Sequence, residues 1–217
     1  MSETFDVASA LRRLTAGRPL VIVDADEVLL MFVEGFDRFL SQRGFYLDLS
    51  SYRLHGNVKD LANSGTLLDV EVTALLEEFR ADLDSLHAVD GAREALLSVH
   101  AAADIVVLSN IRPDQATPRR RNLDALDLPY PLVCNSGPKG EAVGALCSRA
   151  GRPVFFIDDI PAHLASAAKI VKDINLIHMV GDERLKPLLP AYVGTHVRAT
   201  DWHQAAEYMR RLLHLSG

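Results

Sequence analysis

The sequence has little cysteine and no long apolar run. Its 217 residues include two cysteines, Cys134 and Cys147, which are too few for a disulfide framework or a cysteine zinc cluster. This cysteine content is typical of a reducing compartment. No stretch approaches the roughly 20 consecutive apolar residues of a membrane-spanning helix, and the acidic residues Glu3 and Asp6 argue against a signal peptide. We therefore expect a soluble, cytoplasmic protein with no membrane partner.

The chain is also poor in basic residues relative to acidic ones. There are 23 Lys and Arg against 29 Asp and Glu, for a net charge of −6. We therefore expect no nucleic acid polymer as a partner, because such polyanions bind basic surfaces. The hydrophobic share of 48% and the charged share of 24% exclude disordered, collagen-like and coiled-coil classes. The length fits one domain with an insertion or two small domains.

Short apolar runs alternate with segments of helical periodicity, which span residues 7–14, 92–99, 143–150 and 202–212. Residues 20–23, 105–108 and 154–157 are apolar throughout and end at a polar residue. Such runs are typical of buried parallel strands that helices cover on both faces. Residues 132–134 and 174–180 are further strand candidates. The alternation predicts an α/β fold with a Rossmann-like, doubly wound parallel sheet.

Residues 34–89 depart from this alternation. Two segments of helical periodicity, 36–40 and 72–83, flank a polar and irregular stretch without a convincing buried strand. Since this region follows the first predicted strand, we interpret it as an insertion. We predict a small helical cap at 34–89, set into a core formed by residues 1–33 and 90–217.

Polar residues follow the predicted strands at the points where they end. These residues are Asp24 and Asp26, Ser109 and Asn110, and Asp158 and Asp159. Because ligands bind at the carboxyl ends of strands in an open parallel sheet, we expect these side chains to lie together. Lys139, directly before a predicted helix, adds one positive charge.

Several carboxylates at one place repel each other unless a cation lies among them. Oxygen ligands without a nearby Cys or an obligate His favour Mg²⁺. A hydroxyl, backbone amides and a lysine suit the oxygens of a phosphoryl group. The remaining carboxylates can act as nucleophile and general acid/base. The pattern therefore indicates phosphoryl chemistry with Mg²⁺ as cofactor.

Four segments of the chain resemble the motifs of the haloacid dehalogenase-like (HAD) superfamily. Residues 21–28, Val-Ile-Val-Asp-Ala-Asp-Glu-Val, resemble the first motif, in which an apolar strand precedes Asp-x-Asp. Residues 105–110 are similar to the second, Lys139 to the third and residues 155–159 to the fourth. They occur in the family's order at intervals of 85 (24 to 109), 30 (109 to 139) and 19 (139 to 158) residues. The predicted insertion also falls where one class of members has a mobile cap.

The resemblance implies a role for each matching residue. Asp24 would attack phosphorus and form an aspartyl-phosphate. Asp26 would protonate the leaving oxygen and then activate the hydrolytic water. Ser109 and the Asn110 amide would hold the phosphoryl oxygens, and Lys139 would neutralise charge on the nucleophile and the phosphate.

The same resemblance implies the metal ligands. Mg²⁺ would be held by the Asp24 carboxylate, by the backbone carbonyl of Asp26 and by Asp159, with assistance from Asp158. Two positions depart from the family pattern. Glu27 stands where many members have Gly, and we expect it to point into solvent. His163 stands where some members have another Asp, for which the Asp158–Asp159 pair can compensate.

Other charged residues are candidates for substrate contact. Arg112 lies close to the second motif, and Arg53 and His55 in the predicted cap could reach the leaving group. The run of three arginines at 119–121 begins a predicted helix. Most runs of this kind are solvated helix faces, and we interpret this one in the same way.

The predicted function is an Mg²⁺-dependent phosphatase that acts on a small phosphorylated metabolite through Asp24. The aromatic helix after the first motif and residues 157–161 are loosely similar to deoxyribonucleotidase-like members, which suggests a nucleotide. A phosphomutase or another phosphotransferase with the same motifs is an alternative. A phosphate-sensing or interaction module is the non-enzyme alternative, although it has no use for both Asp24 and Asp26. Retention of Asp26 disfavours a dehalogenase.

Overall fold

The computed structural model describes residues 4–81 and 83–215, so Glu3 and part of the predicted helix at 72–83 lie outside the described residues. Its centre is a six-stranded parallel sheet with the order β5-β4-β1-β6-β7-β8. The strands are β1 (Leu20–Val23), β4 (Asp104–Ser109), β5 (Leu132–Cys134), β6 (Val154–Asp158), β7 (Ile174–Met179) and β8 (Val197–Ala199). The chain runs outward from β1 through β4 and β5, then returns to the other side of β1 with β6. This confirms the predicted doubly wound α/β fold.

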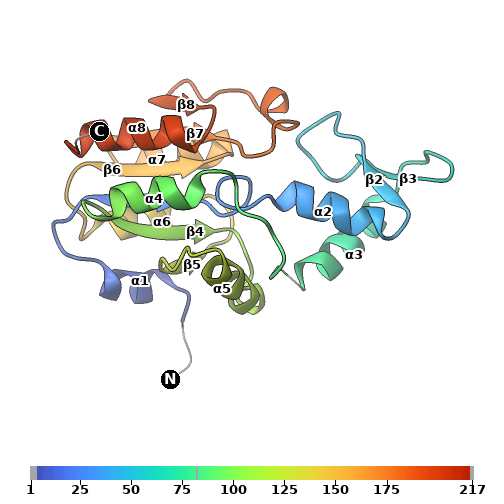
Figure 1. The fold of residues 1–217 in the computed structure, drawn as a ribbon, viewed down its shortest axis with the longest axis horizontal. Helices are drawn as coiled ribbons and strands as arrows, with labels where there is room; N and C mark the ends of the chain where they lie inside the picture. The colour runs from blue at the N-terminus through green and yellow to red at the C-terminus, as the bar shows by residue number, and fades with distance from the viewer. Residues whose placement is uncertain (1–3, 82, 216–217) are drawn as a thin grey trace.

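Helices cover both faces of the sheet (Figure 1). The helices of the core are α1 (Val7–Arg13), α4 (Ala92–His100), α5 (Ala116–Ala125), α6 (Gly140–Cys147), α7 (Pro161–Ile170) and α8 (Trp202–Leu212). In β1, Val21 and Val23 face the apolar cluster formed with α4, α5 and α8, whereas Leu20 and Ile22 face the cluster formed with α1, α6 and α7. The strand is therefore apolar on both faces because both faces are buried.

An insertion separates β1 from the rest of the sheet and extends away from it (Figure 1). It contains α2 (Phe32–Ser41), β2 (Phe45–Leu47), β3 (Val58–Asp60) and α3 (Asp69–Arg80). Phe79 of α3 packs against Phe32 and Phe36 of α2, with ring centroids 5.2 and 5.3 Å apart. Leu76 and Leu86 continue this packing into the core on one face of the sheet. The bounds of a separate cap at 34–89 stay a prediction.

The sequence did not indicate every element. The insertion is not purely helical, because β2 and β3 form an antiparallel pair. These strands have three residues each and are largely half-buried, so they lack the apolar run that marks a buried strand. Strand β8 is equally short, and α7 was not among the predicted helices. The predicted helical segment at 202–212 is α8, which Asp201 caps, since its Oδ1 accepts from the Gln204 amide at 2.8 Å.

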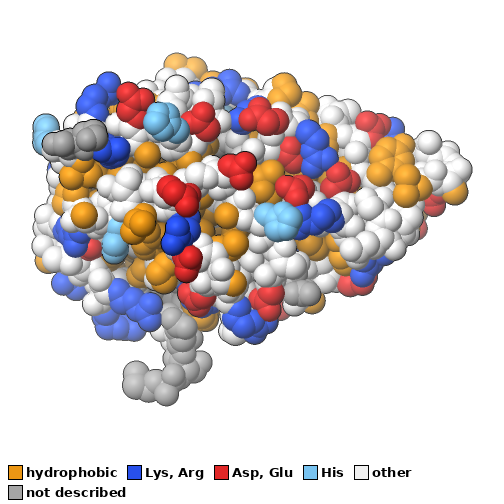
Figure 2. Space-filling model, viewed as in Figure 1, with side chains coloured by type: hydrophobic (Ala, Val, Ile, Leu, Met, Phe, Trp, Pro, Cys, Tyr) orange, Lys and Arg blue, Asp and Glu red, His pale blue; other side chains and the backbone are white. Residues whose placement is uncertain are grey.

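On the face shown in Figure 2, acidic and basic side chains are interspersed, so this face has no patch of one charge. Among the described residues, the helices are all too short or too polar to span a lipid bilayer.

Candidate active site

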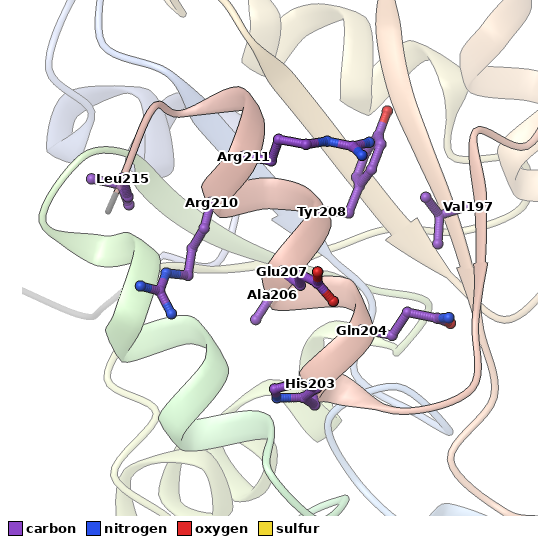
Figure 3. Close-up of a pocket in the computed structure, with 9 residues that line it drawn as sticks. All are labelled: Val197, His203, Gln204, Ala206, Glu207, Tyr208, Arg210, Arg211 and Leu215. Carbon is purple, nitrogen blue, oxygen red and sulfur yellow. The ribbon is translucent and has the colours of Figure 1, made fainter. Parts of the chain in front are cut away.

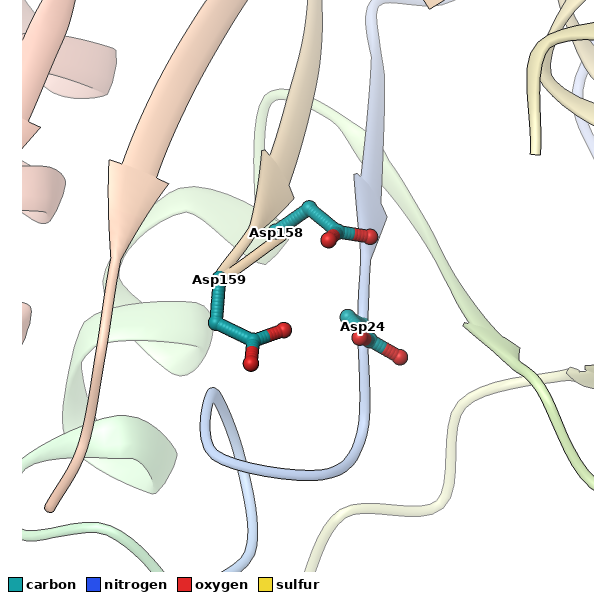
Figure 4. Close-up of side chains that lie close together, drawn as sticks. All are labelled: Asp24, Asp158 and Asp159. Atoms are coloured by element: carbon teal, nitrogen blue, oxygen red, sulfur yellow. The ribbon is translucent and has the colours of Figure 1, made fainter. Parts of the chain in front are cut away.

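Three buried carboxylates converge at the carboxyl edge of the sheet. Asp24 follows β1, Asp158 ends β6, and Asp159 is the next residue. One oxygen of each carboxylate lies within 4.8 Å of the others, and the three side chains lie close together at the ends of their strands (Figure 4). The exposed fractions of the three residues are 6%, 0% and 2%. The structure therefore brings these predicted site residues together.

Lys139 lies between two of these carboxylates. Its Nζ is 2.6 Å from Asp24 Oδ1 and 2.8 Å from Asp158 Oδ2. Close packing of α6 on α7 holds the lysine there, because a Cβ on Gly140 would lie 2.4 Å from the carbonyl oxygen of Ser166. Burial lowers the pKa of the ammonium group, but the two carboxylates outweigh burial and raise the pKa. Lys139 is therefore positively charged in this site.

The cluster has more carboxylates than Lys139 can neutralise. Burial raises the pKa of Asp24 to about 6, against the lowering effect of Lys139. Burial also raises the pKa of Asp158, and burial together with the charge of Asp158 raises the pKa of Asp159 well above its usual range. Asp159 Oδ1 is buried and has no hydrogen-bond partner among the described residues. These oxygens fit a hard divalent cation, which would allow all three groups to ionise.

Ser109 brings an unpartnered hydroxyl to the same edge of the sheet. It ends β4, which pairs with β1 so that Val107 lies opposite Val23. The residue is fully buried, and its Oγ has no hydrogen-bond partner in the part of the chain that the structure describes. A buried hydroxyl without a partner is unfavourable, so it is normally satisfied by a ligand or a water molecule.

The side chain of Asn110 supports the loop that precedes Lys139. Its Nδ2 donates to the carbonyl of Gly137 at 3.0 Å, and its Oδ1 accepts from Asn135 Nδ2 at 2.7 Å. The side chain is exposed and is committed to these contacts. Phosphate binding by the backbone amide of Asn110, which the resemblance implies, stays a prediction.

Asp26 stands apart from the three clustered carboxylates. Its Oδ1 is 2.7 Å from Nη2 of Arg119, and its side chain is 32% exposed.

The prediction that residues 119–121 form a solvated face is wrong for the first two arginines. Arg119 is fully buried, and Arg120 donates to the carbonyls of Leu128 and Tyr130. The error arose because the packing of α5 against the loops at the sheet edge leaves no local signal in the sequence.

The prediction that Glu27 points into solvent is also wrong. The residue is 2% exposed and has a φ of 59°, a conformation that favours glycine. Its carboxylate accepts from the amides of Val33 at 2.7 Å and Asp182 at 3.2 Å. Burial raises the pKa of Glu27 to about 8, although these hydrogen bonds act in the opposite direction. Glu27 therefore fixes the start of α2 to the loop after β7.

Two histidines border the site without joining the carboxylates. The Nε2 atom of His163 is 3.3 Å from Asn110 Nδ2, and burial, followed by the charge of Lys139, lowers the pKa of His163 to about 4. His178 is buried and its Nε2 lies 2.8 Å from the carbonyl oxygen of Asp159. Burial lowers the pKa of His178 as well. With its ring nitrogen donating to that carbonyl, His178 supports the backbone that carries Asp159.

Tyr52 is a site residue that the sequence analysis missed. It lies between β2 and β3 of the insertion, and its hydroxyl donates to Asp159 Oδ2. Burial, and then the charge of Asp159, raises the pKa of this phenol. The tyrosine therefore remains protonated and connects the insertion to the acidic cluster. Its only signal in the sequence is an aromatic residue within a polar segment.

The predicted substrate residues have other partners. Arg112 is exposed, and its guanidinium pairs with Glu77 of α3 at 2.6 Å and with Asp114 at 3.2 Å. His55 Nε2 is 2.9 Å from Thr73 Oγ1, and Arg53 is exposed. Among the described residues, no hydrogen bond or ion pair joins these three side chains to the acidic cluster. Their role in substrate contact stays a prediction.

A cavity of about 530 Å³ adjoins the second motif and lies partly under the insertion. Its lining includes Asn110, Arg112, Asn135 and Arg80. Another cavity, of about 760 Å³, runs along α8 (Figure 3) and shares no residue with the acidic cluster. Of the candidate phosphate-binding residues, Asn110 lines the first cavity.

A central first strand, an insertion directly after it and carboxylates at the ends of β1 and β6 are the arrangement that the sequence resemblance implied. The chain has the fold of the HAD-like hydrolases.

No family model and no curated protein matches this sequence. Solved structures do match its fold. A HAD family hydrolase from Deinococcus radiodurans R1, solved with bound phosphate and sodium, has a TM-score of 0.60 and 16% identity, covering 93% of this chain and 99% of that one. A dehalogenase solved with an intermediate complex has a TM-score of 0.57 and 16% identity, covering 90% and 98%. A variant of CbbY from Rhodobacter sphaeroides, in complex with xylulose-1,5-bisphosphate, has a TM-score of 0.53 and 12% identity, covering 85% and 95%.

Proposed function

We propose that the protein is a HAD-type hydrolase that cleaves small phosphomonoesters with the help of Mg²⁺. The observation that carries this proposal is the buried contact of Lys139 with Asp24 and Asp158, next to the unpartnered hydroxyl of Ser109. A hydroxyl donor and a fixed ammonium group suit the oxygens of a transferring phosphoryl group. Two structures with this fold hold phosphate or a sugar bisphosphate, which supports the same choice of substrate class.

Mg²⁺ would be held by the carboxylates of Asp24 and Asp159 and by the backbone carbonyl of Asp26, with Asp158 beside them. When bound, it would neutralise charge on the phosphoryl oxygens and on the attacking carboxylate. The orphaned Asp159 Oδ1 and the raised pKa values of the cluster support a cation at this place.

In the first step, a carboxylate oxygen of Asp24 attacks phosphorus and displaces the alcohol or nucleoside oxygen. Asp26 gives its proton to that leaving oxygen, so that a neutral alcohol departs and an aspartyl-phosphate remains. Ser109 Oγ and the Asn110 amide donate to the phosphoryl oxygens, while Lys139 offsets their charge. Positioned donors and charges supply most of the catalysis in phosphoryl transfer.

In the second step, water attacks the phosphorus of the aspartyl-phosphate. Asp26, now ionised, takes a proton from this water, and the bond from phosphorus to Asp24 breaks. Inorganic phosphate leaves, and Asp26 is again protonated for the next cycle. Asp26 distinguishes this route from dehalogenation, which needs no acid for the leaving group.

The substrate that we propose is a small phosphorylated metabolite, with a nucleotide as the first candidate. The insertion contacts the acidic cluster through Tyr52 and the second-motif loop through the Arg112–Glu77 pair. It therefore covers the site closely enough to limit the size of the leaving group. A phosphotransferase would use the same residues and differ only in transferring the phosphoryl group to an alcohol instead of water.

The proposal is tested by hydrolysis of p-nitrophenyl phosphate with Mg²⁺, with and without EDTA. We expect turnover that EDTA abolishes and Mg²⁺ restores. The Asp24→Asn variant should lose activity by a factor on the order of 10³ or more, because it lacks the nucleophile. Asp127→Asn is a matched control, since the Asp127 side chain is 73% exposed, pairs with Arg93 at 3.2 Å and has a positive φ that Asn tolerates.

The same assay separates the alternatives. Chloride release from a 2-chloroalkanoic acid without phosphatase activity would identify a dehalogenase. Metal-independent turnover, or turnover that survives in Asp24→Asn, would contradict the proposed route. Binding of inorganic phosphate without turnover of any phosphomonoester would favour a phosphate-sensing module.

A further inference from the structure

Arg119 is a buried cation that neither the fold nor the proposed catalytic steps account for. It lies in the first turns of α5 and has no exposed surface. Its Nη2 is 2.7 Å from Asp26 Oδ1. This contact is an ion pair without hydrogen-bond geometry, and Nε, Nη1 and Nη2 have no hydrogen-bond partner among the described residues. Since burying a guanidinium is costly, the residue requires compensation from a charge, and Asp26 is the carboxylate that supplies it.

The two following arginines have clear structural roles, which sets Arg119 apart. Arg120 donates to two backbone carbonyls of the loop before β5, and Arg121 forms an exposed pair with Asp84 at 2.7 Å. Among the described residues, no hydrogen bond or ion pair joins either arginine to a residue of the candidate site. Arg119 therefore is the arginine of this run that acts on the site, and it does so through Asp26.

The pairing affects the two oxygens of Asp26 differently. Oδ1 is buried and faces Arg119. The side chain as a whole is 32% exposed, so its accessible surface belongs to the remaining atoms, Oδ2 among them. Within the described residues, no hydrogen bond engages Oδ2. Oδ2 is therefore the oxygen that can exchange a proton with a substrate or with water.

We propose that Arg119 is a positioning residue that fixes Oδ1 of Asp26 and thereby presents Oδ2 to the reacting oxygen. This inference rests on the proposed function for the identity of Asp26 as acid/base. Without the guanidinium, the Asp26 carboxyl could rotate about its χ2 bond, which is a broad torsion. The proton would then be delivered from many orientations instead of one, and small misplacements of a catalytic group reduce rates strongly.

The first test is a set of steady-state measurements on p-nitrophenyl phosphate with saturating Mg²⁺. In Arg119→Met we expect kcat to fall by a factor on the order of 10 to 100, with KM changed by no more than about twofold, because Arg119 does not touch the substrate. Arg119→Lys should recover part of the loss, since an ammonium group can still pair with Oδ1. Arg121→Met, from the same helix, should behave like the unaltered protein.

The second test asks whether Arg119 acts through Asp26. In an Asp26→Asn background, Arg119→Met should cause no further loss of kcat, because the group that it positions is already absent. An equal loss in both backgrounds, or a rise in KM at constant kcat, would overturn the proposal and assign Arg119 to structure or to substrate binding. Should Arg119→Met fail to fold, Arg119→Lys with and without Asp26→Asn provides the same comparison.

A third measurement is independent of activity. Asp26→Asn leaves the buried guanidinium unpaired, so it should lower the Tm, and adding Arg119→Met should reverse that loss. Additive effects of the two substitutions on Tm would refute the pairing itself. If the unaltered protein hydrolyses no phosphomonoester while this thermal coupling is present, the proposed function fails and the Arg119–Asp26 pair stands.

Discussion

Ser109 illustrates how a single buried atom can indicate a function. Its Oγ is enclosed without a hydrogen-bond partner in the described part of the chain, which is unfavourable for the folded protein. An alanine at this position would avoid the cost while keeping the strand. Under the proposed function, this hydroxyl donates a hydrogen bond to a phosphoryl oxygen of the substrate.

We predict that Ser109→Ala lowers kcat/KM for phosphomonoesters by a factor on the order of 10 to 100, as loss of one transition-state donor does. The Tm should stay constant or rise, because the substitution removes an unsatisfied hydroxyl. Both quantities are measured beside Ser98→Ala, whose hydroxyl donates to the Ala95 carbonyl on α4, outside the site. A lower Tm with unchanged activity would show that Ser109 serves packing instead.

Residues at strand ends were the part of the site that could be predicted. Asp24, Ser109 and Asp158 follow apolar runs, and the topology of a parallel sheet brings such positions together. The burial of Arg119 and Glu27 could not be predicted, because charged residues are exposed by default and only tertiary contacts bury them. Tyr52 was missed for a related reason, since its partner lies 107 residues away.

At the scale of helices and strands, the pattern of apolar residues decided which elements could be predicted from the sequence. Strands β1, β4 and β6 are buried on both faces, so their apolar runs marked them clearly. Strands β2, β3 and β8 have three residues each and are only partly buried, which leaves no pattern to detect. Helix α7 is rich in alanine and has a weak apolar stripe, which explains why it was not predicted. Its close contact with α6 nevertheless helps to position Lys139.

The junction between β1 and α2 depends on Glu27, and its stability should depend on pH. A carboxyl whose pKa is raised from 4.5 to about 8 binds its proton more tightly in the folded state. Folding is therefore most favoured below about pH 4.5, and stability falls as pH rises toward about 8, by at most about 1.4 kcal/mol per pH unit.

We predict that Glu27→Gln flattens this dependence, because a neutral amide has no charge to bury. The measurement is the free energy of unfolding in urea at pH 5, 6, 7 and 8. The buried carboxyls of Asp24, Asp158 and Asp159 contribute a slope of the same sign, so the informative quantity is the difference between the unaltered protein and the variant. Glu94→Gln, at an exposed position of α4, is the control. Equal slopes in all three proteins would contradict the role assigned to Glu27.

At the scale of the whole molecule, the insertion and the sheet meet at the acidic cluster. Tyr52 donates from the insertion to Asp159 Oδ2, while Oδ1 of the same carboxylate is buried without a partner. One oxygen is thus oriented by the insertion and the other is available to a cation. A hydrogen bond that orients a metal-ligating carboxylate strengthens metal binding. The contact of Tyr52 with Asp159 and occupancy of the cation site should therefore favour each other.

We predict that Tyr52→Phe raises the Mg²⁺ concentration for half-maximal activity by about tenfold, the usual effect of losing such a supporting hydrogen bond. The maximal rate at saturating Mg²⁺ should change much less, because Asp24, Asp26 and Lys139 are untouched. A titration of Tm with Mg²⁺ measures the same shift without any substrate, since a bound cation stabilises the folded state. Tyr46→Phe, in β2 of the same insertion, should titrate like the unaltered protein. Identical Mg²⁺ dependence in Tyr52→Phe would mean that the insertion contacts the site without supporting the cation.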